Sequence, residues 1–154
     1  MFIYLPIQHI FMRPIILFFL GILLLSFFSP ESFAEEIDRF VLDNASPGNL
    51  YLSYKNIVIN NTVGGDAVLA GSTIFINNDV SGDVITASAE LVLNNCQGDV
   101  RSAGDSAIIK GNVSGDLVLA FRKIEVLSNV FIGKKSYLFA NEINFAGTVN
   151  ESLN

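Results

Sequence analysis

From residue 48 onward, short stretches of alternating apolar and polar residues recur at a nearly fixed interval along the chain. Each stretch follows a Gly-Asp-type step, which marks the start of a new unit. These steps lie at Gly48-Asn49, Gly65-Asp66, Gly82-Asp83, Gly98-Asp99, Gly115-Asp116 and, in weaker form, Lys134-Lys135 and Glu151-Ser152. A fixed period of this kind indicates one structural unit that is stacked repeatedly, and it determines the fold before any local propensity does.

Numbered from its glycine, each unit has apolar residues mainly at positions three, five, ten, twelve and sixteen. Apolar residues two apart have the spacing of a β-strand, in which every second side chain points to the same face. We therefore predict three short strands per unit, separated by corners of Gly, Asn, Asp and Ser. Position sixteen is the most regular and holds Val63, Val80, Cys96, Val113, Val130 and Val149.

Three strands and three corners per unit predict an all-β fold, a triangular β-solenoid of about six coils over residues 48–154. No stretch after residue 50 keeps the spacing of an amphipathic helix. Left-handed solenoids are built on six-residue repeats, and these apolar positions fit no such grid, so we predict a right-handed coil. Residues 35–47 are long enough to form an N-terminal cap on the first coil.

Residues 1–34 have a different character. Met12-Arg13 is followed by an apolar run over residues 15–28 and then by Ser32-Phe33-Ala34. A positive start, a short apolar core and small residues at −3 and −1 are typical of a secretory signal peptide. We predict a signal-peptide helix over residues 1–34, cleaved after Ala34, with Met12 as an alternative start. An uncleaved membrane anchor is the alternative, because translation from Met1 lengthens the apolar segment toward the ~20 residues of a span.

Composition removes several classes of function. The formal net charge of −6 argues against nucleic acid, whose phosphates require clustered Lys and Arg. The only histidine, His9, is lost with the signal, which excludes Ser-His-Asp and Cys-His catalysis and most zinc sites. We expect no enzymatic activity and no cofactor. The single cysteine, Cys96, lies in the position-sixteen column, and we expect it to be a small buried apolar residue rather than an intermolecular disulfide partner.

The acidic residues after the glycines form a regular series. Asp66, Asp83, Asp99 and Asp116 hold position two of successive units, so they should lie one rung apart, about 4.8 Å. That spacing is compatible with a cation site. We favour a structural role, in which each Asp stabilises its corner by hydrogen-bonding the local backbone.

Two outward columns and the end of the stack are predicted to be covered by a partner. The outward position eleven is apolar in four successive units, an apolar stripe formed by Val58, Phe75, Val92 and Ile108. A second outward column, at position four, begins and ends with Tyr51 and Tyr137. The last coils are the most aromatic, and an open solenoid end exposes unpaired strand edges. We therefore predict an assembly interface that contains Phe131, Phe139, Phe145 and Leu153.

Four of the corners carry a recurring motif. They read Val-Gly-Gly-Asp-Ala at 63–67, Val-Ser-Gly-Asp-Val at 80–84, Gln-Gly-Asp-Val at 97–100 and Val-Ser-Gly-Asp-Leu at 113–117, each followed by Ala at position six. This motif resembles that of the bactofilins and their exported polymer-forming relatives, over about residues 48–153. The resemblance implies a right-handed β-helix that polymerises end to end without nucleotide and scaffolds envelope-shaping enzymes. Bactofilins are usually cytoplasmic or on the inner membrane face, and this chain departs from them by its export signal.

Together these features predict a non-enzymatic structural or scaffold protein of the bacterial cell envelope, exported to the periplasm or envelope. It would assemble with itself through its open ends, with an envelope protein or a glycan as a further partner, and without nucleic acid. The alternative is a carbohydrate- or surface-binding module that uses the Tyr51/Tyr137 face. A truncated polysaccharide lyase-like enzyme is disfavoured by the few coils and the absence of long loops.

Cleavage of the signal makes a direct prediction. The mature chain should begin at Glu35, because the small residues that precede it form the cleavage site. Intact-mass measurement of the protein from an envelope fraction tests this. A mass that retains Met12 to Ala34 would show instead a membrane-anchored protein.

Overall fold

The computed structural model describes residues 38–150, so the predicted signal segment, Ala34 and Leu153 lie outside the described residues. Eleven strands make up the regular structure of this part: β1 (Arg39–Leu42), β2 (Leu50–Ser53), β3 (Asn56–Ile59), β4 (Ala67–Ile76), β5 (Val84–Leu93), β6 (Val100–Ile109), β7 (Leu117–Val126), β8 (Phe131–Ile132), β9 (Ser136–Phe139), β10 (Glu142–Phe145) and β11 (Thr148–Val149). Val, Ile and Leu dominate their inward positions, as the half-buried surface of a sheet favours.

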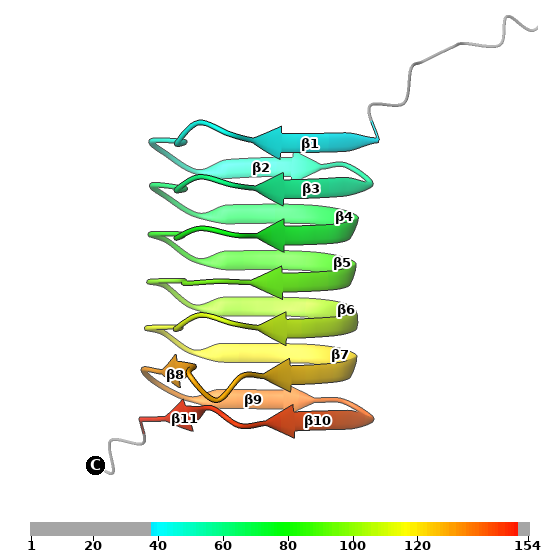
Figure 1. Cartoon of the computed structure of the whole chain (residues 1–154), viewed down its shortest axis with the longest axis vertical. Helices are drawn as coiled ribbons and strands as arrows, with labels where there is room; N and C mark the ends of the chain where they lie inside the picture. The colour runs from blue at the N-terminus through cyan, green and yellow to red at the C-terminus, as the bar shows by residue number, and fades with distance from the viewer. Residues whose placement is uncertain (1–37, 151–154) are drawn as a thin grey trace, which may run out of the picture. The chain divides into compact units, whose positions relative to one another are not determined.

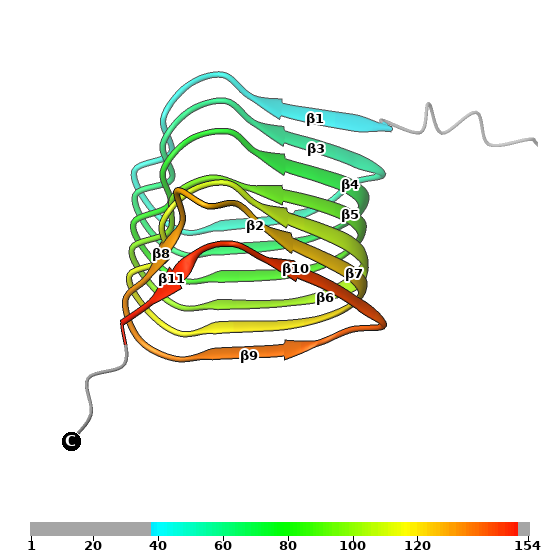
Figure 2. The same ribbon diagram turned by 60° about the horizontal axis from the view of Figure 1, so that its bottom comes forward.

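The strands stack in parallel as a right-handed β-solenoid of about seven turns with about 17 residues per turn, one turn more than predicted (Figure 1). Strands β4 to β7 each bend once and so contribute to two faces, while the third face is short and pairs through isolated bridges such as Val63 to Val80 (Figure 2). Parallel neighbours are joined by evenly spaced hydrogen bonds, so each rung repeats the path of the one before it.

The predicted inward columns form the core. Position ten, for example, is the column Ile57, Ile74, Leu91, Ala107 and Ile124, in which every side chain is at most 1% exposed. Inward columns at positions three, five, twelve and sixteen line the same interior. The column at position five includes two polar residues, Thr86 and Ser102, whose buried hydroxyls hydrogen-bond each other. The sequence pattern therefore predicted the faces that the strands bury, but the first two of the three short strands predicted per unit are one bent strand in β4 to β7.

One corner contributes to the core in a way that the sequence pattern did not predict. Position seven lies where β4 to β7 bend. The side chain at this position in β7, Phe121, is only 5% exposed and belongs to the core. Gly104 lies directly opposite Phe121 in the preceding rung, and a Cβ there would lie 2.8 Å from the Phe121 ring and closer still to the Ser88 carbonyl oxygen. Tyr54, at the same position in the first coil, also packs on the core and stacks on Phe40.

An insertion shifts one column from its predicted position. Leu117 of β7 pairs with Ser136 of β9, a longer step along the chain than the one from Val100 to Leu117 that precedes it. The sequence pattern assigned Val130 to the sixteenth-position column, but the bridge from Val113 leads to Ile132, which is fully buried. Val130 is buried as well, within the widened corner that precedes β8. The extra residues therefore lie before Ile132, where a longer corner lets the chain rejoin the stack.

The predicted cap segment contains a strand of the stack. β1 pairs in parallel with β3, with Phe40 opposite Ile57 and Leu42 opposite Ile59. Paired residues are as far apart along the chain as in the next pair of strands, so residues 39–42 form a regular rung. Phe40 and Leu42 are partly buried against the core. This half-coil ends the described stack at the N-terminal side.

The core predicts how substitutions should act. Leu93 is fully buried in position twelve, so Leu93→Asp would bury an unpaired charge and should destabilise the fold by several kcal/mol. Glu125→Gln, at an outward position of the neighbouring column, is the control and should change stability by less than about 0.5 kcal/mol. Thermal unfolding followed by circular dichroism measures both; equal shifts would show that the assigned faces are wrong.

Candidate functional site

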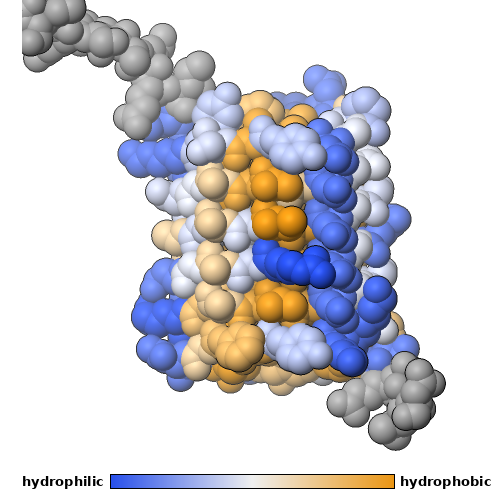
Figure 3. All heavy atoms as spheres, turned by 180° about the vertical axis from the view of Figure 1, so that it is seen from behind, coloured by the Kyte–Doolittle hydropathy of each residue, from blue (hydrophilic) through white to orange (hydrophobic). Residues whose placement is uncertain are grey.

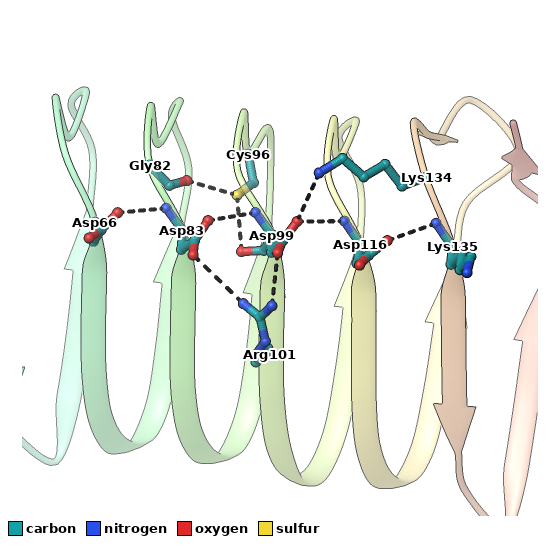
Figure 4. Close-up of polar contacts among 9 residues, drawn as sticks. All are labelled: Asp66, Gly82, Asp83, Cys96, Asp99, Arg101, Asp116, Lys134 and Lys135. Carbon is teal, nitrogen blue, oxygen red and sulfur yellow. Dashed lines mark hydrogen bonds and ion pairs between the residues drawn. The ribbon is translucent and has the colours of Figure 1, made fainter. Parts of the chain in front are cut away.

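The Gly-Asp corners form a continuous ladder of hydrogen bonds along the solenoid (Figure 4). In each rung one side-chain oxygen accepts the backbone N–H of the equivalent residue in the next rung. The distances, N to Oδ1, are 2.8 Å from Asp66 to Asn49, 2.9 Å from Asp83 to Asp66, 2.8 Å from Asp99 to Asp83, 2.8 Å from Asp116 to Asp99 and 3.0 Å from Lys135 to Asp116. The sequence analysis expected each Asp to hydrogen-bond the backbone of its own corner. That expectation is wrong, because these bonds join one rung to the next.

The ladder explains why glycine precedes each acidic residue. A Cβ on Gly82 would lie 2.2 Å from Asp66 Oδ1 and 2.7 Å from the Asp66 backbone nitrogen. A Cβ on Gly65, Gly98 or Gly115 would likewise lie 2.2–2.3 Å from the Oδ1 atom of the ladder residue in the preceding rung. None of residues 38–150 has a positive φ, so close approach rather than backbone conformation requires the glycine. Gly48 begins the ladder, and a Cβ there would meet no described atom of another part of the chain within 4 Å.

Cationic side chains lie along the acidic ladder. Arg101 lies between two rungs, with its guanidinium 2.8 Å from Asp99 Oδ2 and 3.6 Å from Asp83 Oδ2 (Figure 4). Lys134 Nζ lies 3.8 Å from Asp99 Oδ1. The pKa of Asp99 is lowered, first by the hydrogen bond from the Asp116 backbone and then by the one from Arg101. Asp99 is therefore a charged acceptor at neutral pH, and ion pairing reduces the repulsion between neighbouring rungs.

Residues 38–150 contain no group of three or more acidic, His or Cys side chains arranged to hold a metal ion. One oxygen of each ladder carboxylate up to Asp116 is already used by the next rung. The geometry of the ladder is that of a structural element of the corner.

The predicted apolar stripe lies on the face formed by β1, β3, the second halves of β4 to β7 and β10. Val58, Phe75, Val92 and Ile108 are paired in register, and Val41 of β1 extends the stripe by one rung. These side chains cover one another: none of the five is fully exposed, and Val92 is only 6% exposed. Stacking of each side chain on its neighbours thus supplies much of their burial without any partner.

The opposite face, formed by β2, the first halves of β4 to β7 and β9, is more open. A hydrophobic column follows the solenoid there, interrupted by one charged side chain and bordered by the hydrophilic ladder (Figure 3). This position-four column consists of Tyr51, Val68, Ile85, Arg101, Val118 and Tyr137. Tyr51 is 68% exposed and Tyr137 46%. Beside it, position six holds small exposed alanines in four successive rungs, which makes the face flat.

The predicted assembly residues do not all lie at the end of the stack. Phe139 is 63% exposed but pairs with Ala120 at position six, so it points outward from the flat face. Phe131, 44% exposed, lies on β8, one rung before the last. Phe145 occupies inward position twelve of β10 and is partly buried against the core. Ile143, which the sequence analysis did not single out for this surface, is inward at position ten and still 45% exposed, because no described rung follows it.

Cys96 continues the sixteenth-position column between Val80 and Val113 and is 1% exposed. Its thiol is unpaired and lies 3.3 Å from the Gly82 carbonyl oxygen. Burial raises the pKa of this thiol to about 11, which keeps it protonated and unreactive at neutral pH. The prediction of a small buried apolar residue is confirmed.

Comparisons of the chain with protein-family models, with curated proteins and with solved structures find no match. Within residues 38–150, no helix is long and apolar enough to cross a membrane.

The corner geometry makes a sharp prediction. Gly82→Ala forces a Cβ against the Asp66 carboxylate and backbone, so we expect a loss of about 1–3 kcal/mol in unfolding free energy. Gly48→Ala is the matched control, because the same change meets open space in the first rung and should be nearly neutral. Chemical denaturation of the two variants compares them directly. A Gly82→Ala protein as stable as Gly48→Ala would show that the close approach is not required.

Proposed function

We propose that this protein is a non-enzymatic structural scaffold, exported to the bacterial cell envelope, that assembles with itself through the open ends of its solenoid. The observation that carries the proposal is the last described rung. Ile143 occupies a core position and is nevertheless 45% exposed, and Phe145 two residues on is only partly buried. An apolar core that is cut open at its end favours contact with another apolar surface.

The strand edges support the same proposal. Within residues 38–150, β10 and β9 pair only with β7, and β2 pairs only with β4. Each of these strands therefore has one described partner and one edge whose backbone groups can hydrogen-bond another chain. Unpaired strand edges at both described ends of the stack are the geometry that an assembling protein needs.

The ladder carboxylates support a non-enzymatic role. They lie in successive rungs, and their oxygens accept backbone N–H groups or pair with Arg101. A general acid or base must be available to a substrate, whereas these groups are committed to joining rungs. The structural role therefore accounts for the most conspicuous acidic residues of the chain.

A carbohydrate- or surface-binding module is the second candidate function, and the exposed Tyr51 and Tyr137 on one flat face favour it. These two rings lie five rungs apart in the same column, about 24 Å at the spacing of paired strands. The intervening column consists of three aliphatic residues and Arg101. A single sugar ring could stack on one tyrosine, but a glycan would have to extend along the solenoid to use both.

Assembly can be tested by placing charge at the open end. Ile143→Lys should shift the protein from oligomer or polymer to monomer with an unchanged circular dichroism spectrum, because a buried lysine at the contact would cost several kcal/mol. Ile85→Lys is the matched control, since Ile85 is 43% exposed but lies on the side of the stack. Light scattering and negative-stain microscopy of the purified protein report the assembly state.

The assembly state of the wild-type protein tests the scaffold proposal itself. If it stays monomeric at high concentration, the scaffold proposal fails, and the binding-module alternative becomes the better one. If both lysine variants assemble as the wild type does, the end of the stack is not the contact.

A further inference from the structure

The flat face carries apolar side chains that the regular stack leaves uncovered. Ile85 is 43% exposed although β5 is paired on both edges, so an open end of the stack does not explain its exposure. This residue belongs to the position-four column, which is apolar except for Arg101 and the ends of which are tyrosines. Beside it, the position-six column consists of small exposed side chains in four successive rungs, namely Ala70, Ala87, Ala103 and Ala120. The face thus presents a row of large side chains next to a row of small ones (Figure 3).

A second copy of the chain fits this face when a two-fold axis runs along the solenoid, between the two columns. Each position-four side chain then lies against the position-six residue of the same rung in the partner. Ile85 would meet the partner's Ala87, and in the same way each large side chain of the middle rungs would meet an alanine. Packing of large side chains on small ones lets two surfaces approach closely without voids. Only in the last rung would two large side chains meet, Tyr137 and the partner's Phe139.

The charges at the two borders of the face favour this arrangement. In it, position two of one copy lies against position eight of the other. Asp116 would lie opposite the partner's Arg122, an exposed residue, and among residues 38–150 only the Oδ1 atom of Asp116 accepts a hydrogen bond. One rung away, Asp99 would lie opposite the partner's Asp105. Two guanidinium groups lie beside that acidic pair, because Arg101 contacts Asp99 at 2.8 Å and Arg122 contacts Asp105 at 2.6 Å.

The inverted arrangement brings like charges together. A two-fold axis that crosses the solenoid in the plane of contact places position two of one copy against position two of the other. The ladder carboxylates of both copies would then meet along one border, Asp66, Asp83, Asp99 and Asp116 from each. Like charges that face each other across an interface are strongly unfavourable. The acidic ladder therefore selects the arrangement in which both solenoids run in the same direction.

Arg101 interrupts the apolar column, and a partner would cover it as well. Its guanidinium already lies 2.8 Å from Asp99 Oδ2 and 3.6 Å from Asp83 Oδ2 (Figure 4). Removal of a charge from water is most unfavourable when the charge has no partner. Because Arg101 is paired before any contact forms, the position-four column can be covered along its whole length.

The size of the face is compatible with a weak specific contact. It extends over six rungs from β2 to β9. At the spacings of a β-sheet it is about 29 Å long and, from position two to position eight, about 20 Å wide. Two such faces would bury about 1,200 Å² in total, which is at the lower end of the range for specific interfaces. We therefore expect a pair that forms as the protein concentration rises.

We propose that two copies of this chain pair side by side, flat face against flat face, with their solenoids running in the same direction. The pair buries the position-four column of each copy against the alanines of the other and places Asp116 beside the partner's Arg122. It uses a surface separate from the open ends, so it does not depend on the assembly through the ends that is proposed above.

Sedimentation equilibrium of the Ile143→Lys protein isolates this contact, because that change blocks the open end. We expect a monomer at low concentration and a dimer, with no larger species, as the concentration rises. Ala87→Gln, added to this protein, places a larger neutral side chain where the faces approach. Since two-fold symmetry introduces the change twice, it should weaken the dimer by about tenfold or more.

Ser128→Gln is the matched control, because Ser128 is an exposed small residue in the corner before β8, away from the flat face. It should leave the dimer unchanged. A protein that is monomeric at every concentration would overturn the proposal. So would an Ala87→Gln protein that dimerises as strongly as the Ser128→Gln protein.

A single cysteine tests the orientation, in a Cys96→Ala background of the same protein. Ser53 is exposed at position six of the first rung of this face. In the proposed pair it would lie about 12 Å from the partner's Ser53, whereas in the inverted pair the partner's Ser53 would lie about 24 Å further along the solenoid. Ser53→Cys treated with a short bismaleimide should therefore give covalent dimers. Dimers that form only when Ser53→Cys protein is mixed with Phe139→Cys protein would show the inverted pair and overturn the proposed one.

The wild-type chain separates this proposal from assembly through the open ends. Species larger than a dimer in the wild-type protein report contacts at the ends, and they should persist in Ala87→Gln. A wild-type protein that forms a dimer and nothing larger would overturn assembly through the ends and leave the side-by-side pair intact.

Discussion

Backbone hydrogen bonding between parallel rungs is the constraint on which the rest of this structure depends. Each strand from β3 to β7 pairs with a strand before and after it, and the step along the chain between paired residues stays nearly constant. At a spacing of about 4.8 Å, every side chain must be compatible with its counterparts in the adjacent rungs. The glycines of the corners follow from this constraint, because the side-chain oxygen of one rung occupies the place where a Cβ of the next would lie.

The same constraint turns isolated side chains into ladders. Asp83 both accepts the N–H of Asp99 and donates its own N–H to Asp66, so one residue type stabilises two junctions. Asn77 likewise donates its amide to Asn60 Oδ1 at 3.0 Å in another corner. On the outside, the apolar stripe is shielded by its own stacking. Exposed hydrophobic residues therefore indicate a contact surface mainly where the stacking stops or where small neighbouring side chains leave them uncovered.

Those two situations occur at the last described rung and on the flat face. Ile143 loses its cover because no described strand follows it, whereas Ile85 is exposed beside small side chains on a side of the stack although its strand is paired on both edges. The first situation provides both an apolar surface and unpaired backbone groups, while the second provides only side-chain surface. This difference is the physical basis for favouring the ends as contacts.

The amino-acid sequence by itself determined the repeat, the strand positions and the inward columns. Residues one unit apart occupy the same environment in successive rungs, so similar residue types recur at the same positions of the repeat. The sequence could not determine the path of the chain through the corners. The inward Phe121, the bridge from Val113 to Ile132 and the rung-to-rung direction of the aspartate bonds all depend on which backbone atoms come close in space. Phe139 shows the same limit: its apolar character is plain in the sequence, but only the register with Ala120 shows that its side chain points outward from a face instead of continuing the core.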